Sequence, residues 1–169
     1  VTRGFRTSMS YEQNQALVYR EARLLDDPQR DEWLKCYHED VTYWMPAWDD
    51  DNELTEDPQT EISLIYYPNR NGLEDRVYRL KTERSGASSI PEPRTVHLTS
   101  NLEILERDGD TVNLRFNWQT NSHRYNTSQS FFGVSFYTLD CSGEQPLITE
   151  KKVVLSNDYI NQVIDIYHL

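Results

Sequence analysis

The sequence predicts an α+β fold in which a curved antiparallel sheet wraps on N-terminal helices. Two patterns lead to this prediction. Apolar residues recur at helical spacing in the first half of the chain, whereas apolar and polar residues alternate from Thr95 onward. Helices followed by a long antiparallel meander are typical of a sheet with helices on one face. The 169 residues suit one core, so we expect an N-terminal arm at residues 1–9 and a single domain at residues 10–169.

Three helices are expected in the first half. Ser10 can cap the first helix, and Gln13, three residues later, completes a capping box. The second helix is expected to use Asp27 as its N-cap, with the following proline in its first turn. The third is expected to start at Asn71, with Glu74 as its capping-box partner.

The strands are short before residue 95 and long after it. A bulge near Ser100 and Asn101 could shift the register of the first long strand. Val112, Leu114 and Phe116 alternate with polar residues, as expected for a half-buried strand. The expected strands cover residues 41–45, 61–67, 95–104, 112–119, 130–139 and 147–155.

Composition excludes several classes of protein. The net charge of −11 disfavours nucleic acid and anionic membranes as partners. No apolar run approaches the roughly 18 residues that span a bilayer, and residues 1–10 lack the apolar centre of a secretory signal. Two cysteines are too few for a disulfide scaffold, so we expect a reduced, cytoplasmic protein. The 11 Tyr and 4 Trp suit both a core and subunit interfaces.

Residues 49–57 form an acidic segment whose carboxylates suggest a calcium site. A calcium-binding EF-hand loop needs Gly at its sixth position and Glu at its twelfth. Starting at Asp49, these positions hold Leu54 and Thr60, and starting at Asp50 puts Leu54 at the fifth position. The pattern fails in both registers. We therefore expect a solvated loop between two strands, with Trp44 and Trp48 beside it supplying core or interface contacts.

The cysteines and histidines match the known patterns of iron sites only in part. Cys36 and His38 form half of the Cys-x-His, Cys-x-x-His pattern that holds a Rieske cluster, but Cys141 is not followed by a histidine at the required spacing. A mononuclear iron site needs two histidines and a carboxylate. A composite site from His97 and His123 on neighbouring strands remains open. The four histidines are isolated in sequence: His38, His97, His123 and His168.

One enzymatic reading also remains open. A curved sheet wrapped on helices makes a pocket, and a histidine–carboxylate pair inside it could abstract a proton. His97 is out of phase with Val96 and Leu98, and His123 is out of phase with Trp118. Both histidines are therefore expected on the outer face of the sheet. Arg115 belongs to a polar row that is also expected there, which favours a contact surface over a pocket.

Long segments of the chain resemble the small (beta) subunit of Rieske-type aromatic-ring-hydroxylating dioxygenases, most closely the benzoate 1,2-dioxygenase branch, with toluate, anthranilate and 2-halobenzoate enzymes nearby. The resemblance covers nearly the whole chain from about Met9. It is carried by "YREARLLDD", "DEWLKCYHEDVTYWMPAWDDDNELTEDPQTEISLIYY", "GLEDRVYRLKTERS", "LRFNWQT" and "KKVVLSNDYINQVIDIYHL".

The resemblance implies a cone-shaped sheet of the nuclear-transport-factor-like type, shared with scytalone dehydratase. It implies an alpha (large) subunit that carries the Rieske two-iron two-sulfur cluster, the mononuclear iron and the substrate pocket. Three copies of each subunit would form a hexamer, to which a reductase delivers electrons from NADH. The complex would add both atoms of O2 to benzoate, giving a cis-dihydrodiol. No catalytic, cofactor-binding or metal-binding residue is then expected in this chain.

Two hypotheses follow. In the first, the chain is a non-catalytic structural subunit of such a dioxygenase and also associates with itself as a trimer. In the second, it is a free-standing cone-fold isomerase or dehydratase that uses a histidine–carboxylate pair. An enclosed polar pocket with such a pair would favour the second, and a cone filled by side chains would favour the first. The residues expected at a subunit interface are Trp44, Trp48, His97, Arg115 and His123.

Overall fold

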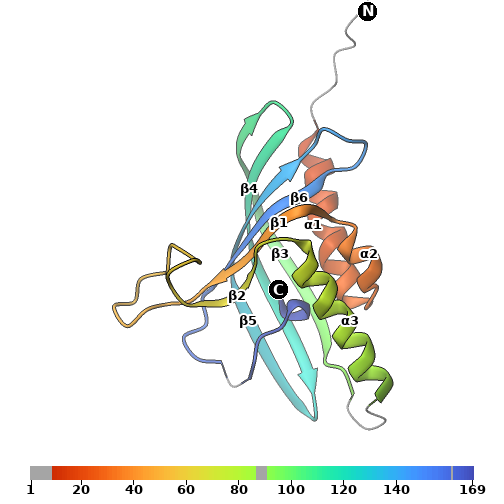
Figure 1. Cartoon of the computed structure of the whole chain (residues 1–169), viewed down its shortest axis with the longest axis vertical. Coiled ribbons are helices and arrows are strands. Elements are labelled where there is room, and N and C mark those ends of the chain that lie inside the picture. Colours follow the sequence, from red (N-terminus) through yellow and green to blue (C-terminus); the bar gives the residue numbers. More distant parts are fainter. Residues whose placement is uncertain (1–8, 87–90, 161) are drawn as a thin grey trace, which may run out of the picture.

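The computed structural model describes residues 9–86, 91–160 and 162–169. Within these ranges the helices lie on one side of a six-stranded, strongly curved sheet, and together they enclose a cone (Figure 1). The helices are α1 Tyr11–Asp26, α2 Arg30–Leu34 and α3 Arg70–Gly86, with a final 3-10 turn, η1, at Ile166–His168. The strands are β1 Tyr37–Pro46, β2 Ser63–Tyr67, β3 Arg94–Asp108, β4 Thr111–Arg124, β5 Thr127–Asp140 and β6 Leu147–Leu155.

The strand order is β2-β1-β6-β5-β4-β3, so β2 and β3 form the two edges. Every neighbouring pair is antiparallel except β1 and β6, which are parallel. Helix α1 packs on β3 and α3 packs on β1, so the helices span the concave face. The predicted α+β class with helices on one face is therefore confirmed, and one parallel pair is added to the expected meander. No described helix is long and apolar enough to cross a membrane.

The predicted helix starts are correct in one case of three. Ser10 Oγ accepts from the Gln13 amide at 3.2 Å and the Gln13 side chain accepts from the Ser10 amide at 2.8 Å, so the capping box of α1 is confirmed. The prediction for Asp27 is wrong because its amide bonds to a carbonyl of α1 and ends that helix, and α2 begins later without a side-chain cap. The third helix begins before Asn71, whose amide bonds to the Asn69 side chain at 3.0 Å.

The strand pattern follows the predicted alternation. Val112, Leu114, Phe116 and Trp118 are all buried, and β4 runs from Thr111 to Arg124. The predicted bulge is present, because the β3–β4 register shifts after Ser100. The expected arm falls mostly on residues 1–8, which lie outside the described residues.

A buried ion pair occupies the interior of the cone. Glu21 of α1 and Lys151 of β6 are 2% and 1% exposed, and the Lys151 Nζ lies 2.9 Å from Glu21 Oε1. Three more side chains donate to the same carboxylate: Trp33 at 2.9 Å, Tyr37 at 2.5 Å and Tyr137 at 3.1 Å. One carboxylate thus holds two helices and three strands together. We call these five residues the Glu21 cluster.

The charges in the Glu21 cluster are set by their surroundings. Burial alone would raise the pKa of Glu21, but the charge of Lys151 and the donated hydrogen bonds outweigh burial and lower this pKa below its ordinary value of 4.5. Burial and the nearby carboxylate raise the pKa of Tyr37 and Tyr137 well above 10.0. The carboxylate is therefore ionised and both phenols are neutral at pH 7.

We expect Lys151→Met to destabilise the chain by about 3–5 kcal/mol, because it leaves the Glu21 carboxylate buried without its counter-charge. The double variant Lys151→Met, Glu21→Gln should recover much of this loss, since neither charge remains. The measurement is urea unfolding of the three proteins at pH 7. A double variant that is less stable than Lys151→Met would contradict this account.

The same variant should respond to pH in the opposite sense to the parent. In the parent, the lowered pKa of Glu21 makes its contribution to stability full above the unfolded value and lost as the pH falls. In Lys151→Met, burial dominates and raises this pKa, so protonation relieves the penalty. We therefore expect the difference in unfolding free energy between the two proteins to narrow from pH 7 to pH 5. A constant difference would show that Glu21 is not the group responsible.

Candidate functional site

The interface residues expected from the sequence separate into three places. Trp44 and Arg115 lie on the outer face of the sheet, where both side chains are half-buried. Trp48 and His123 lie at the ends of strands and are exposed. His97 points into the cone, so its predicted outward orientation is wrong. Its side chain is only 5% exposed.

The error at His97 has a physical cause. Val96 and Leu98, its neighbours on β3, are 56% and 51% exposed, so the apolar side of this edge strand is its outer side. The inward position is occupied by a histidine because Asp26, at the end of α1, provides a partner for it. The His97 Nδ1 lies 2.5 Å from Asp26 Oδ1, and the His97 amide donates to Asp26 Oδ2 at 2.9 Å. Thr95 also donates to Asp26, at 2.9 Å.

Asp26 and His97 have the arrangement of a histidine–carboxylate pair. One ring nitrogen is held by the carboxylate and the other, Nε2, is buried without a hydrogen-bond partner. Thr120, directly opposite on β4, is fully buried and its hydroxyl also has no partner. Burial would raise the pKa of Asp26, but His97 outweighs it and lowers this pKa. The pair can therefore orient an imidazole, as a general base requires, although Nε2 is shielded from solvent.

Large aromatic side chains fill the part of the cone interior that surrounds the Glu21 cluster. The rings of Trp33 and Tyr37 meet edge to face at 4.8 Å, and Tyr43 lies 6.3 Å from Trp33. All three rings are fully buried around the Glu21 cluster. Lys151 also lies 5.1 Å from the centre of the Tyr43 ring, a favourable cation–π contact. These close contacts make the region around the Glu21 cluster a packed core.

The other histidines do not join His97 in a metal site. His123 is exposed at the end of β4, where its Nδ1 lies 2.8 Å from the Ser128 hydroxyl. It points away from the cone interior, so the composite site from His97 and His123 is not formed. His168 is buried against Phe131 at 4.8 Å, and burial lowers its pKa to about 4, so it is neutral at pH 7.

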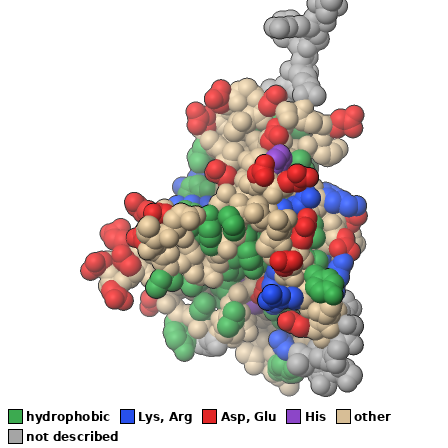
Figure 2. Space-filling view, viewed as in Figure 1, with side chains coloured by type: hydrophobic (Ala, Val, Ile, Leu, Met, Phe, Trp, Pro, Cys, Tyr) green, Lys and Arg blue, Asp and Glu red, His purple; other side chains and the backbone are tan. Residues whose placement is uncertain are grey.

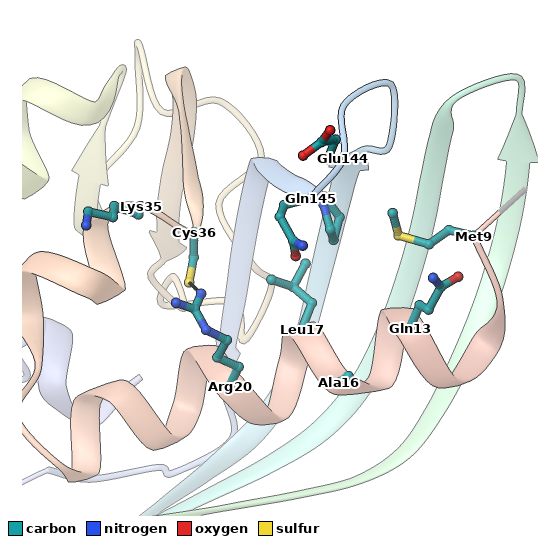
Figure 3. A pocket seen from close by; sticks show the side chains of 10 residues that line it. Met9, Gln13, Ala16, Leu17, Arg20, Lys35, Cys36, Glu144 and Gln145 are labelled. Carbon is teal, nitrogen blue, oxygen red and sulfur yellow. Dashed lines mark hydrogen bonds between the residues drawn. The ribbon is translucent and has the colours of Figure 1, made fainter. Parts of the chain in front are cut away.

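The residues of this chain do not fit a Rieske cluster. Cys36 is buried at the start of β1, and burial raises the pKa of its thiol to about 11, whereas a metal-bound cysteine must be a thiolate. Its sulfur receives a hydrogen bond from Arg20 at 3.4 Å, as Figure 3 shows. Both cysteines are free thiols. Over the described ranges, no three His, Cys, Asp or Glu side chains are grouped so as to hold a metal ion.

Figure 3 views a groove between α1 and the loop that joins β5 to β6. Gln13, Leu17 and Arg20 line the groove from the helix, and Gln145 lines it from the loop. Cys36 lies at one end of the groove, where Arg20 reaches it. The groove brings no pair of titratable groups together as an acid–base couple would require.

The acidic loop between β1 and β2 uses its carboxylates to shape its own backbone. Asp49 Oδ1 accepts from the amides of residues 51 and 53 at 2.9 and 2.8 Å. Glu61 accepts from the amides of Glu56 and Asp57 at 2.6 and 2.7 Å. Figure 2 shows acidic side chains gathered over the loop at one side of the molecule. Trp48 anchors the loop, because its indole donates to the Leu155 carbonyl at 2.7 Å.

The outer face of the sheet carries a row of cations and aromatic rings that sequence reasoning recognised only in part. Lys152 lies 5.0 Å from the Trp44 ring, and Arg115 lies 5.4 Å from the Phe136 ring and 3.9 Å from a Glu103 oxygen. The row crosses all six strands, one residue on each, and we call it the outer ladder. Its members, from β2 to β3, are Tyr66, Trp44, Lys152, Phe136, Arg115 and Glu103.

Trp44 and Arg115 were found from the sequence because they stand out in polar surroundings. The other members of the outer ladder were missed because their neighbours lie on other strands. The register between strands, which the sequence does not show, determines these neighbours. The strongest local signal was the alternation in β6, where Lys151 points inward and Lys152 outward. Aromatic rings and Arg, which the outer ladder contains, are enriched at protein contact surfaces.

Comparison with known proteins places these features in a family. The family model for the ring hydroxylating beta subunit matches residues 20–162. The chain is 60% identical over 162 residues to the benzoate 1,2-dioxygenase subunit beta of Acinetobacter baylyi, covering 96% of this chain and 95% of that one. It is also 60% identical over 162 residues to the toluate 1,2-dioxygenase subunit beta of Pseudomonas putida, covering 96% and 99%.

Solved structures agree. The crystal structure of the beta subunit of the benzoate 1,2-dioxygenase from Burkholderia mallei has a TM-score of 0.84 and 51% identity, covering 97% of this chain and 100% of that one. A nuclear transport factor 2-like protein with a cystatin-like fold from Novosphingobium aromaticivorans has a TM-score of 0.58 at 12% identity, which confirms the predicted cone fold alone. The match along most of the sequence and the shared fold lead to one conclusion: the chain belongs to the family of beta subunits of aromatic-ring-hydroxylating dioxygenases.

Proposed function

We propose that this chain is the structural beta subunit of a dioxygenase that adds O2 across the ring of benzoate or a substituted benzoate, giving a cis-dihydrodiol. The observation that carries the substrate class is the equal 60% identity to beta subunits of a benzoate and a toluate enzyme, each over 96% of this chain. The small subunit of a 2-halobenzoate 1,2-dioxygenase is 56% identical to this chain over 154 residues. The chain works as part of an oxidoreductase complex and does not itself touch the reacting atoms.

The chemistry of the side chains supports a division of labour between subunits. The Rieske cluster and the mononuclear iron are assigned to an alpha subunit, because the thiols and histidines of this chain do not fit either group. A reductase would pass electrons from NADH to that subunit. The present chain would supply a rigid support, since the Glu21 cluster and the packed rings around it tie its helices to its sheet.

We further propose that three copies of each subunit form a hexamer and that the outer face of the sheet takes part in its contacts. Trp44 and Arg115 belong to the outer ladder. Trp48 and His123 are exposed at the ends of strands. His97 is not proposed as a contact, because its side chain is buried against Asp26. The single domain of residues 10–169 would act as one unit. Two free cysteines support a cytoplasmic location.

The Asp26–His97 pair favours one alternative function, an isomerase or dehydratase that uses His97 as its base. Its geometry is suitable, because Asp26 holds Nδ1 and leaves Nε2 free. A reactant would have to reach an atom that is shielded from solvent. The structural role of the pair is sufficient to explain it, since it joins the end of α1 to the edge strand β3.

We expect the purified chain to bind no stoichiometric iron and to be colourless, because Cys36 and His38 match only half of the cluster pattern and Cys141 does not complete it. Elemental analysis and a visible spectrum of the chain, expressed without its partner, check this. The matched measurement is the same spectrum of the complex with the large subunit, which should show the absorption of a cluster. Red-brown colour in the isolated chain would overturn the assignment of the cofactors.

We expect His97→Ala to leave the turnover of benzoate per assembled hexamer unchanged within about twofold, while a general base typically contributes 10²- to 10⁴-fold. Loss of the partner of the half-buried Asp26 carboxylate should lower the stability of the chain by about 1–3 kcal/mol. His123→Ala is the surface control and should change neither quantity. Intact complexes isolated by size, assayed per iron centre, provide the measurement.

Two results would decide between the functions. A His97→Ala complex that assembles normally but loses a hundredfold in turnover would place this chain in the chemistry. Equal turnover with a lower melting temperature would support the structural role. Asp26→Asn gives a second test of the same pair, because it removes the charge while keeping the shape of the side chain.

A further inference from the structure

Nine outward side chains on β3, β4 and β5 form a grid without any ionisable group. Each row joins one residue of each strand in cross-strand register: Val96 with Asn121 and Ser130 in the first row, for example. Charged residues make up 27% of the whole chain, so a surface of this extent without any of them is notable. We call these residues the uncharged grid: Val96, Leu98, Ser100, Asn117, Gln119, Asn121, Ser130, Phe132 and Val134.

The uncharged grid has the composition of an interface core. Val96, Leu98 and Phe132 are 56%, 51% and 48% exposed, and amide and hydroxyl side chains lie among them. Gln119 donates to the Ser130 hydroxyl at 3.0 Å, which fixes the polar groups in place. A shallow groove runs between the rows. The cores of protein interfaces are depleted of charge and mix apolar with hydrogen-bonding groups in this way.

The position of the uncharged grid in the sheet adds a second reason to expect that it is covered. It includes the edge strand β3, which is 15 residues long, whereas the opposite edge strand β2 has five. A long edge strand with exposed apolar residues invites association, and proteins protect such edges with Lys, Pro or bulges. Residues 95–100 contain neither Lys nor Pro, and the bulge lies beyond them.

Charge indicates what covers the grid. Each copy of this chain carries a net charge of −11, so two copies repel one another unless their contact avoids acidic surface. The grid is a surface where two acidic copies can meet without opposing charges, whereas the neighbouring outer ladder carries Glu103, Arg115 and Lys152. We infer that the uncharged grid is the contact surface for a second copy of this chain. The inference rests on the proposed function, because the hexamer brings three copies together.

A photo-crosslinking amino acid at position 119 tests which chain faces the grid. The intact complex with the large subunit is isolated by size and then irradiated. We expect a product with the mass of two copies of this chain. The same amino acid at position 105 is the control, because Leu105 on β3 is 54% exposed and lies outside the grid; it should give little of this product.

Each result has one meaning. A product that joins position 119 to the large subunit, or no product at all, overturns the inference while leaving the proposed function intact. Failure to isolate any complex with the large subunit would instead count against the proposed function.

A charge substitution provides an independent test. Leu98→Asp places a carboxylate in the grid of each acidic copy, where like charges across an interface cost several kcal/mol. We expect the association of this chain with itself, measured by sedimentation across a concentration series, to weaken by about tenfold or more. Leu105→Asp adds the same charge at similar exposure outside the grid and should behave as the parent. Equal association of the two variants would overturn the inference, and unchanged melting temperatures would show that both remain folded.

Discussion

The ion pair between Glu21 and Lys151 is the interaction on which the rest of this structure depends. A carboxylate with four donors around it, fully enclosed, fixes where α1 lies over β1, β5 and β6. Desolvation of two charges is costly, and the four hydrogen bonds donated to the carboxylate offset part of that cost. The same groups occupy the volume in which a cone-shaped protein could otherwise hold a ligand. The polar network and the rings around it make this part of the interior a packed core.

A rigid interior moves the functional surface to the outside of the sheet. There the six strands carry two kinds of surface side by side. The outer ladder pairs cations with aromatic rings, and the uncharged grid carries amides and apolar groups. The two differ in the partner chemistry that they suit, which is what a subunit with more than one neighbour requires. The acidic loop lies at the margin, and the carboxylates of Asp49 and Glu61 bond to its own amides.

Much of the fold could be predicted from the sequence, because local signals there agree with the final structure. The capping box at Ser10 and the alternation around Phe116 are local, and both are present. The direction of His97 could not be predicted, because alternation shows which residues share a face but not which face is inside. At β3 the inward direction of His97 depends on its contact with Asp26, which is 71 residues away in sequence. Glu21 and Lys151 were missed for the same reason: a charge can be buried only if its partner is known.

The parallel pairing of β1 with β6 has a consequence for how the chain is made. The two strands meet at Tyr43 and Lys151, about 100 residues apart, and β6 is also the strand that links β1 to the rest of the sheet. During synthesis, α1 and β1 leave the ribosome long before the strand that completes them. Contacts between such distant segments form slowly. The nascent chain must therefore hold an unpaired Glu21 and an open strand until β6 is translated, a period in which a chaperone or an early-bound partner subunit would protect it from aggregation.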